Sequence, residues 1–283
     1  MTGRLLSIVD CRSSIVGIQH PTPAVLTPRE GPFGVIATLG VSLYGMELTT
    51  ETQTTTRSDE TPRTETTVAQ TVAATRERVR AGVLLFGFGL VTMMGIITAE
   101  AFYPGYNAGV QEISDLGASV PPNSVIVEPS ATIFNTTMLV AGLLVLGATY
   151  FLHRAYRDRL LTGVFALLSV GLMGVGVFDG SEVPMHGLFA LLTFTTGGFA
   201  ALAASRVVPR AFRYLSLTVG GFVLLLLASV VGFGIAGVTH PMAPLGLGGI
   251  ERFVAYPVVL WLLAFGGYLL AGPAEIESSA VGE

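Results

Sequence analysis

The sequence has no lysine and only one cysteine, Cys11. A single cysteine excludes a disulfide within the chain and a metal site built from several thiolates. Without lysine, the chain has no phosphate-binding loop of the Gly-Lys-Ser/Thr type. It also contains no His-Glu-x-x-His helix and no Gly-x-Ser-x-Gly turn, so the usual signatures of metalloproteases and α/β-hydrolases are missing.

Charge is also scarce. Only 12% of the 283 residues are charged, whereas about 25% is usual in a soluble domain. All 15 basic residues are arginines, the formal net charge is −4 and no large basic patch is present, which argues against nucleic acid as a partner. Because 51% of the residues are hydrophobic, we expect the partners of this chain to be membrane lipids.

The apolar residues gather in six segments, each close to the roughly 20 residues that a helix needs to cross a bilayer. The segments are rich in glycine and alanine, the small residues that let membrane helices approach closely. They do not alternate between apolar and polar residues, which excludes a transmembrane β-barrel. We predict an all-α, polytopic membrane bundle of about six transmembrane helices, at residues 80–103, 131–152, 160–178, 185–205, 214–237 and 250–272.

Composition divides the chain into three parts. Residues 1–79 hold the Thr-rich polar sequence and have too little apolar surface to offset the entropy of ordering, so we predict a disordered cytoplasmic leader. Residues 1–45 contain neither a spanning segment nor a good signal peptide, and our hypothesis is that they are a mis-called gene start. Residues 80–272 are the predicted membrane domain, and residues 273–283 are a short cytoplasmic tail.

The arginines predict the orientation in the membrane. Three clusters lie on one side of the predicted helices, and the other side carries only Arg252. Because arginine is enriched in cytoplasmic loops, we expect a multi-pass protein of the plasma membrane with both termini in the cytoplasm. The loops at 104–130, 179–184 and 238–249 then face outward. The clusters are Arg76, Arg78 and Arg80; Arg154, Arg157 and Arg159; and Arg206, Arg210 and Arg213.

The first outward loop, residues 104–130, is longer than most connections, and long loops are often functional. Within it, Val110, Ile113 and Leu116 are apolar at helical spacing. We expect a short helix lying at the membrane interface from Val110 to Leu116, ended by Gly117.

The outer face also gathers the candidate catalytic residues Asp115, Glu182 and His186. Glu182 and His186 are four positions apart, so they share one face of a helix that begins near Glu182. Histidine titrates near neutral pH and suits a general base, and a carboxyl group suits a general acid.

Arg252, Asn135 and Glu251 are the candidate substrate-binding residues. A guanidinium group clamps a phosphate or carboxylate through two parallel hydrogen bonds. That chemistry suits a lipid head group or a polar substrate at the membrane surface.

Two other interpretations of this cluster stay open. Imidazole and carboxylate side chains, here with His240, also bind divalent metals, but the spacing is not diagnostic. We therefore assign no metal and specify no cofactor. The second interpretation is purely structural, with Asp115 capping a short helix and the charges of Glu251 and Arg252 lying at the interface.

Four short pieces of sequence carry a resemblance to a known family. They are Ile113-Ser114-Asp115-Leu116-Gly117, Phe134-Asn135, Gly176-Val177-Phe178 followed by Pro184 and His186, and Glu251-Arg252 before Trp261. Together they resemble the domain of unknown function 998, a family of polytopic archaeal and bacterial membrane proteins. The resemblance covers about residues 80–272 and implies a multi-helix membrane domain without an established activity. Phe178-Asp179 stands where the family has Phe-Pro.

Three function classes follow. The first is a lipid-interacting or scaffold-type bundle with a polar cluster at its outer face. The second is a membrane-embedded hydrolase or transferase that acts on a lipid or envelope substrate, and it requires Asp115, Glu182, His186 and Arg252 to converge. The third is a small transporter, which requires a continuous polar path and broken helices.

Overall fold

The structure is a computed structural model that describes residues 61–272, with side chains from residue 70 onward. Over this range the chain is helical and contains no strand. Each of its six long helices has a stretch long and apolar enough to cross a membrane, which confirms the predicted all-α bundle. The helices are α1 (Thr61–Ala101), α2 (Ser130–Tyr156), α3 (Arg159–Val177), α4 (Val183–Ala204), α5 (Arg210–Ala236) and α6 (Gly246–Ala271), with 3-10 helices η1 (Ser114–Leu116) and η2 (Ala243–Leu245).

Helix α1 begins at Thr61, earlier than the expected start at residue 80. The added turns include Ala, Glu, Arg and Gln, which are good helix formers, although their commonest residue is threonine, a poorer one. Extending an existing helix also costs less than nucleating a new one. Only Gln70–Ala101 is apolar enough to span a membrane. The predictions for residues 1–60 of the leader and for the tail at 273–283 concern residues outside the described range.

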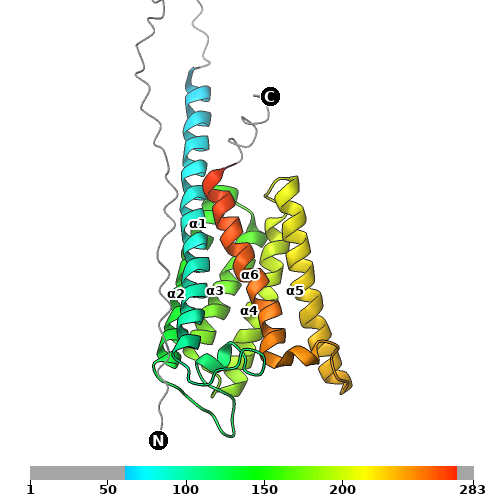
Figure 1. The fold of residues 1–283 in the computed structure, drawn as a ribbon. Helices are drawn as coiled ribbons and strands as arrows, with labels where there is room; N and C mark the ends of the chain where they lie inside the picture. The colour runs from blue at the N-terminus through cyan, green and yellow to red at the C-terminus, as the bar shows by residue number, and fades with distance from the viewer. Residues whose placement is uncertain (1–60, 273–283) are drawn as a thin grey trace, which may run out of the picture. The chain divides into compact units, whose positions relative to one another are not determined.

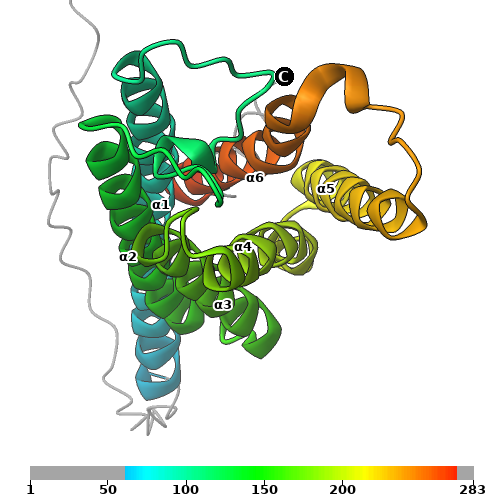
Figure 2. The same ribbon diagram turned by 90° about the horizontal axis from the view of Figure 1, so that it is seen from below.

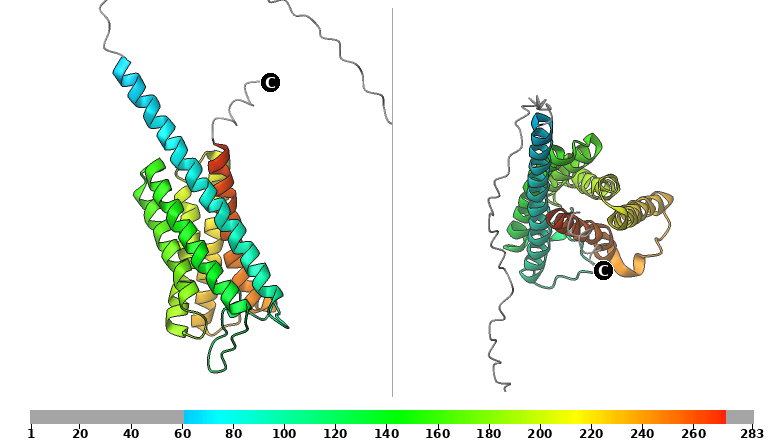
Figure 3. Two further views of the ribbon diagram at one scale, coloured as in Figure 1. Left: turned by 90° about the vertical axis from the view of Figure 1, so that its left-hand side faces the viewer. Right: turned by 90° about the horizontal axis from the view of Figure 1, so that it is seen from above.

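Helices that follow one another in sequence pack side by side from α1 to α5, and α6 returns to lie against α1. Figures 1 and 2 show α5 at the edge of this bundle, where it packs mainly against α4 and α6. Figure 3 shows α1 crossing the bundle obliquely and extending beyond it. The sites below are therefore built by α1 to α4 and α6.

Glycines allow a close helix contact between α1 and α6. A Cβ atom placed on Gly266 would lie 2.5 Å from the backbone nitrogen of Phe86, and one on Gly82 would lie 2.9 Å from the carbonyl oxygen of Gly266. The two helices approach closely only because neither position carries a side chain. Other glycines, such as Gly87 and Gly163, face open space.

The arginine clusters gather at one end of the bundle, here called the arginine end. Arg154 of α2 lies 3.5 Å from Glu77 of α1, and Arg206 lies 2.9 Å from Asp158 at the turn between α2 and α3. Asp158 also caps α3, because its carboxylate accepts a hydrogen bond from the Leu161 N–H at 2.9 Å. The opposite end, where residues 102–129, 178–182 and 237–245 connect the helices, is called the loop end.

Candidate functional site

The first long loop folds back into the loop end of the bundle. Ile113 and Leu116 are 5% and 0% exposed and belong to the main hydrophobic core, whereas Val110 is 68% exposed. The expected interfacial helix from Val110 to Leu116 is therefore wrong in length and place. Only the three residues of η1 are helical, followed by Gly117 as the C-cap. Burying Ile113 and Leu116 between the helices outweighs laying them at the interface, because more of their apolar surface is covered by the closed end of the bundle.

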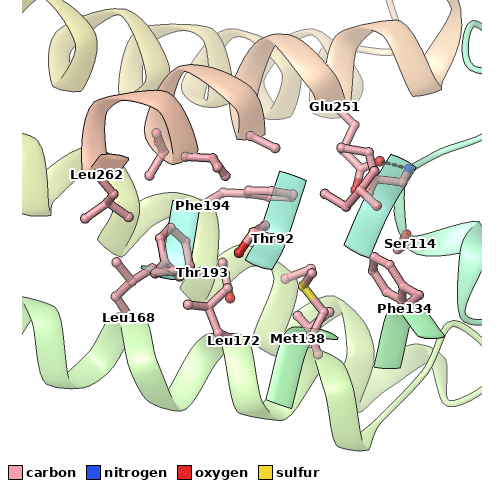
Figure 4. Close-up of a pocket in the computed structure, with 18 of the residues that line it drawn as sticks. Thr92, Ser114, Phe134, Met138, Leu168, Leu172, Thr193, Phe194, Glu251 and Leu262 are labelled. Carbon is pink, nitrogen blue, oxygen red and sulfur yellow. Dashed lines mark hydrogen bonds between the residues drawn. The ribbon is translucent and has the colours of Figure 1, made fainter. Parts of the chain in front are cut away.

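Residues 112–118 form this inserted segment, which we call the plug. Glu251 on the first turns of α6 holds it from the side, because its carboxylate accepts a hydrogen bond from the backbone N–H of Ile113 (Figure 4). Ser130 at the start of α2 holds it from another side, since its hydroxyl donates to the carbonyl oxygen of Leu116 at 3.2 Å. The plug is thus fastened to two helices.

Arg252, next to Glu251, fastens the loop that leads into the plug. Its guanidinium donates to the Glu100 carboxylate and to the Tyr106 hydroxyl, both at 2.7 Å. It also donates to three backbone carbonyls, those of Ala108, Gln111 and Gly248, at 2.8 to 3.1 Å. A planar guanidinium has five N–H donors in a fixed fork, and this one is directed at protein acceptors.

Tyr106 links this arginine to the plug. Its hydroxyl accepts from Arg252 and donates to the carbonyl oxygen of Glu112 at 2.7 Å. Burial is the main cause that raises the pKa of Tyr106 to about 12, and the hydrogen bond from Arg252 partly opposes it. Tyr106 therefore stays protonated and keeps its donor for Glu112 at any ordinary pH.

Two carboxyl groups of the plug are perturbed by their surroundings. Burial raises the pKa of Glu112, and the nearby Asp115 raises it further, while His186 acts in the opposite direction. Burial also raises the pKa of Asp115, against a hydrogen bond at 2.9 Å that its carboxylate accepts from the Glu112 N–H. The plug therefore holds acidic side chains that are partly removed from water by the fold.

His186 lies on the first turns of α4 and is 8% exposed. Its Nδ1 lies 2.8 Å from the carbonyl oxygen of Phe178. Because a carbonyl oxygen only accepts, Nδ1 carries the proton, and in the neutral ring Nε2 is left as an acceptor. The end of α3 thus fixes both the orientation and the tautomer of this histidine.

A cavity runs from the plug into the bundle (Figure 4). Its volume is about 80 Å³, which is room for several waters. Ser114, His186 and Glu251 lie at its loop end, and the rest of the wall is almost entirely apolar. The wall includes Phe88 and Ile96 of α1, Phe134 and Met138 of α2, Leu168 and Leu172 of α3, Phe194 of α4, and Val258 and Leu262 of α6.

The apolar part of this wall holds two threonines: the hydroxyl of Thr193 donates to the Phe189 carbonyl at 2.8 Å, and the other is Thr92. It is 3% exposed, and its Oγ1 is buried without a hydrogen-bond partner. Other buried helix threonines, such as Thr137 and Thr149, donate to the carbonyl four residues earlier at 2.7 Å. Thr92 does not, so its hydroxyl is buried in the wall without a partner.

The remaining predicted site residues lie elsewhere. Glu182 is exposed, and its side chain makes no hydrogen bond or ion pair within residues 70–272. The Asn135 amide oxygen is buried against Gly117 without a hydrogen-bond partner, outside the cavity wall. His240 bonds to Ser229 and to the Met242 N–H at the end of α5. In the part of the chain that is described, no three His, Cys, Asp or Glu side chains are placed to hold a metal.

The structure thus brings His186 and Glu251 to one cavity and places Asp115 in the plug beside it. The sequence analysis missed Tyr106 as a link and Thr92 as a polar group in the wall. Thr92 had a weak signal, as a polar residue inside an apolar segment. The N–H of Ile113 had none, because every residue except proline carries one.

Comparison with known proteins agrees with this architecture. A family model described as "Protein of unknown function (DUF998)" matches residues 86–268, which covers the helices and the plug. No curated protein and no solved structure matches the chain.

Proposed function

This chain belongs to the DUF998 family of integral membrane proteins of unknown function, and from that premise we propose that it binds a single-chain lipid inside its helix bundle. The observation that carries the proposal is the cavity, with an apolar wall and polar groups at one end. A concave, mostly apolar site with a few convergent polar groups is what small-molecule binding requires.

The length of the cavity suits one hydrocarbon chain. On α6 its wall extends from Glu251 to Leu262, a rise of about 16 Å at 1.5 Å per residue. Because the cavity of about 80 Å³ is smaller than a lipid chain, a chain in this position would push apart the aromatic rings of Phe88, Phe134 and Phe194. Its head group would lie beside the plug.

The hydrolase or transferase and the transporter have less support. The Glu182 side chain is exposed and makes no hydrogen bond to His186 or Asp115 among the described residues, and the guanidinium of Arg252 is directed at protein acceptors instead of the cavity. A transporter needs a continuous polar path, whereas several interior hydroxyls along the described helices, such as those of Thr137 and Thr149, bond to their own helix.

The proposal is tested by filling the cavity. Ala255 lines it, whereas Ala228 of α5 is exposed on the bundle surface. We would extract wild type, Ala255→Phe and Ala228→Phe into native bilayer nanodiscs and weigh the released proteins by native mass spectrometry. We expect wild type and Ala228→Phe to retain one single-chain lipid each, and Ala255→Phe to lose it.

Two outcomes would contradict lipid binding. One is that wild type retains no such lipid. The other is that Ala255→Phe retains as much lipid as Ala228→Phe while its circular dichroism shows that it is folded.

We also infer that the arginine end faces the cytoplasm of a plasma-membrane protein, with both termini inside. The arginines of the turns around Asp158 and Pro209 support this orientation. Single cysteines at Arg157 and Val125, introduced in a Cys11→Ser background, should differ in labelling by an impermeant maleimide, with only the Val125 site labelled from outside. Labelling of both sites from the same side would reverse the inference.

A further inference from the structure

Polar groups without a full set of hydrogen-bond partners lie at the loop end of the cavity. One carboxylate oxygen of Glu251 is bound to the Ile113 N–H, and the other has no hydrogen bond within residues 70–272. Nε2 of neutral His186 is also an acceptor. The Ser114 hydroxyl, in the same wall, can donate or accept. A head group that can both donate and accept hydrogen bonds, such as a hydroxyl, satisfies these groups.

The charge around these atoms opposes an anion. Glu112, Asp115 and Glu251 are all close to the head of the cavity. Arg252, the arginine of this end, is paired with Glu100 and does not line the cavity. A phosphate or carboxylate head group would be desolvated beside acidic side chains without a free cation, which is unfavourable.

Thr92 supplies a second, independent requirement. Its hydroxyl is buried in the wall and bonds to neither its own helix nor another side chain. On α1 it lies four residues before Ile96, which also lines the cavity. Thr92 is therefore about 6 Å farther from the loop end than Ile96. A buried hydroxyl without a partner costs free energy that a ligand acceptor recovers.

We propose that the cavity binds a neutral single-chain glycerol lipid, with its free hydroxyls at Ser114, His186 and Glu251 and its ester or ether oxygen at Thr92. The assignment rests on the lipid binding proposed above and adds the head-group class. The hydroxyls donate to His186 and Glu251 and accept from Ser114. The Thr92 hydroxyl donates to the oxygen that joins glycerol to its chain, and the chain continues toward Leu262.

Three probes with the same alkyl chain separate these features. Monolauroylglycerol carries both the hydroxyls and the ester, dodecanol carries a hydroxyl alone, and dodecyl phosphate carries an anion. Their dissociation constants would be measured by native mass spectrometry on the full chain in phosphatidylcholine nanodiscs. We expect monolauroylglycerol to bind most tightly, at least about tenfold more tightly than dodecyl phosphate.

The Thr92→Val variant then tests the deeper contact. We expect it to weaken the binding of monolauroylglycerol by about five- to tenfold, the effect of one lost hydrogen bond. The binding of dodecanol should be unchanged. Thr98→Val is the matched control, because Thr98 is exposed and its hydroxyl donates to the Met94 carbonyl at 2.6 Å. Ser114→Ala should weaken the binding of monolauroylglycerol and of dodecanol to the same extent.

The outcomes distinguish this inference from the proposal it rests on. Equal or tighter binding of dodecyl phosphate, or a Thr92→Val variant that binds monolauroylglycerol like wild type, overturns the head-group assignment while lipid binding stands. If no probe binds wild type more tightly than it binds Ala255→Phe, lipid binding in the cavity itself fails.

Discussion

The guanidinium of Arg252 lies 2.7 Å from the carboxylate of Glu100, an ion pair that joins the first turns of α6 to the end of α1. The two side chains are 13% and 28% exposed, so the pair is largely withdrawn from solvent. The residue next to Arg252 holds the plug, and the same guanidinium holds the loop before it. The pair therefore stabilises the loop end of the bundle.

Removing this arginine should destabilise the protein strongly. We expect Arg252→Ala to lower the free energy of unfolding by about 3 kcal/mol or more, because it leaves the largely buried Glu100 carboxylate unpaired. Arg252→Lys should recover only part of the loss, since an ammonium lacks the planar fork. Thermal unfolding in detergent measures both.

Arg206→Ala is the control for charge alone. Arg206 is 54% exposed and pairs with Asp158 at the opposite end, and such surface pairs contribute about 0–1 kcal/mol. A loss of stability as large as that of Arg252→Ala would contradict the special role of the loop-end pair.

The Tyr106 hydroxyl should contribute measurably to the same network. Tyr106→Phe removes the acceptor for Arg252 and the donor to Glu112, and we expect a loss of about 1–2 kcal/mol. Tyr103 packs against Tyr106 with ring centroids 5.4 Å apart, and no hydrogen bond of its hydroxyl is seen within residues 70–272. Tyr103→Phe should therefore stay within about 0.5 kcal/mol of wild type in the same unfolding measurement. Equal effects of the two variants would argue against the network.

Adjacent glycines on α6 should respond differently to alanine. A Cβ on Gly266 meets the α1 backbone at Phe86, whereas a Cβ on Gly267 has no atom within 4 Å. We expect Gly266→Ala to cost about 1–3 kcal/mol through overpacking, and Gly267→Ala to be neutral or stabilising by up to about 1 kcal/mol through helix propensity. Unfolding of the two variants side by side checks this. A tolerated Gly266→Ala would mean that α1 and α6 do not approach as described.

Stability should fall with rising pH, and Glu112 is one of the two plug carboxyl groups responsible. Burial and Asp115 raise its pKa above the ordinary 4.5, so the folded protein binds this proton more tightly than the unfolded chain. The stabilisation is fully present below the unfolded pKa and is lost as pH rises through the folded pKa. We expect Tm to decrease as the pH is raised above 4.5, and Glu112→Gln to flatten that decrease.

Glu128→Gln is the control for this pH dependence, because Glu128 is an exposed carboxylate of the same long loop. It should leave the shape of the curve as in wild type. A Glu112→Gln variant with an unchanged pH profile would show that another group governs this range.

Part of the site was accessible to sequence reasoning. His186 and Glu251 were predicted from their residue types near helix starts, and both line the cavity. Glu182 was predicted from its spacing to His186. However, its N–H bonds to the Asp179 carbonyl just before α4 and its side chain is exposed. Spacing along a helix places two residues on one face only where both belong to the helix, and α4 begins after Glu182.

The amino-acid sequence by itself determined that six segments are helical and long enough to span a bilayer, because in lipid each segment must satisfy its own backbone hydrogen bonds and length and hydropathy are local properties. Only the tertiary structure decided that the loop around Ile113 turns inward and that Glu251 receives it. It alone also showed that the Thr92 hydroxyl is buried without a partner in the wall of a cavity. Those facts depend on how residues far apart in the chain pack together, which no local pattern of residues records.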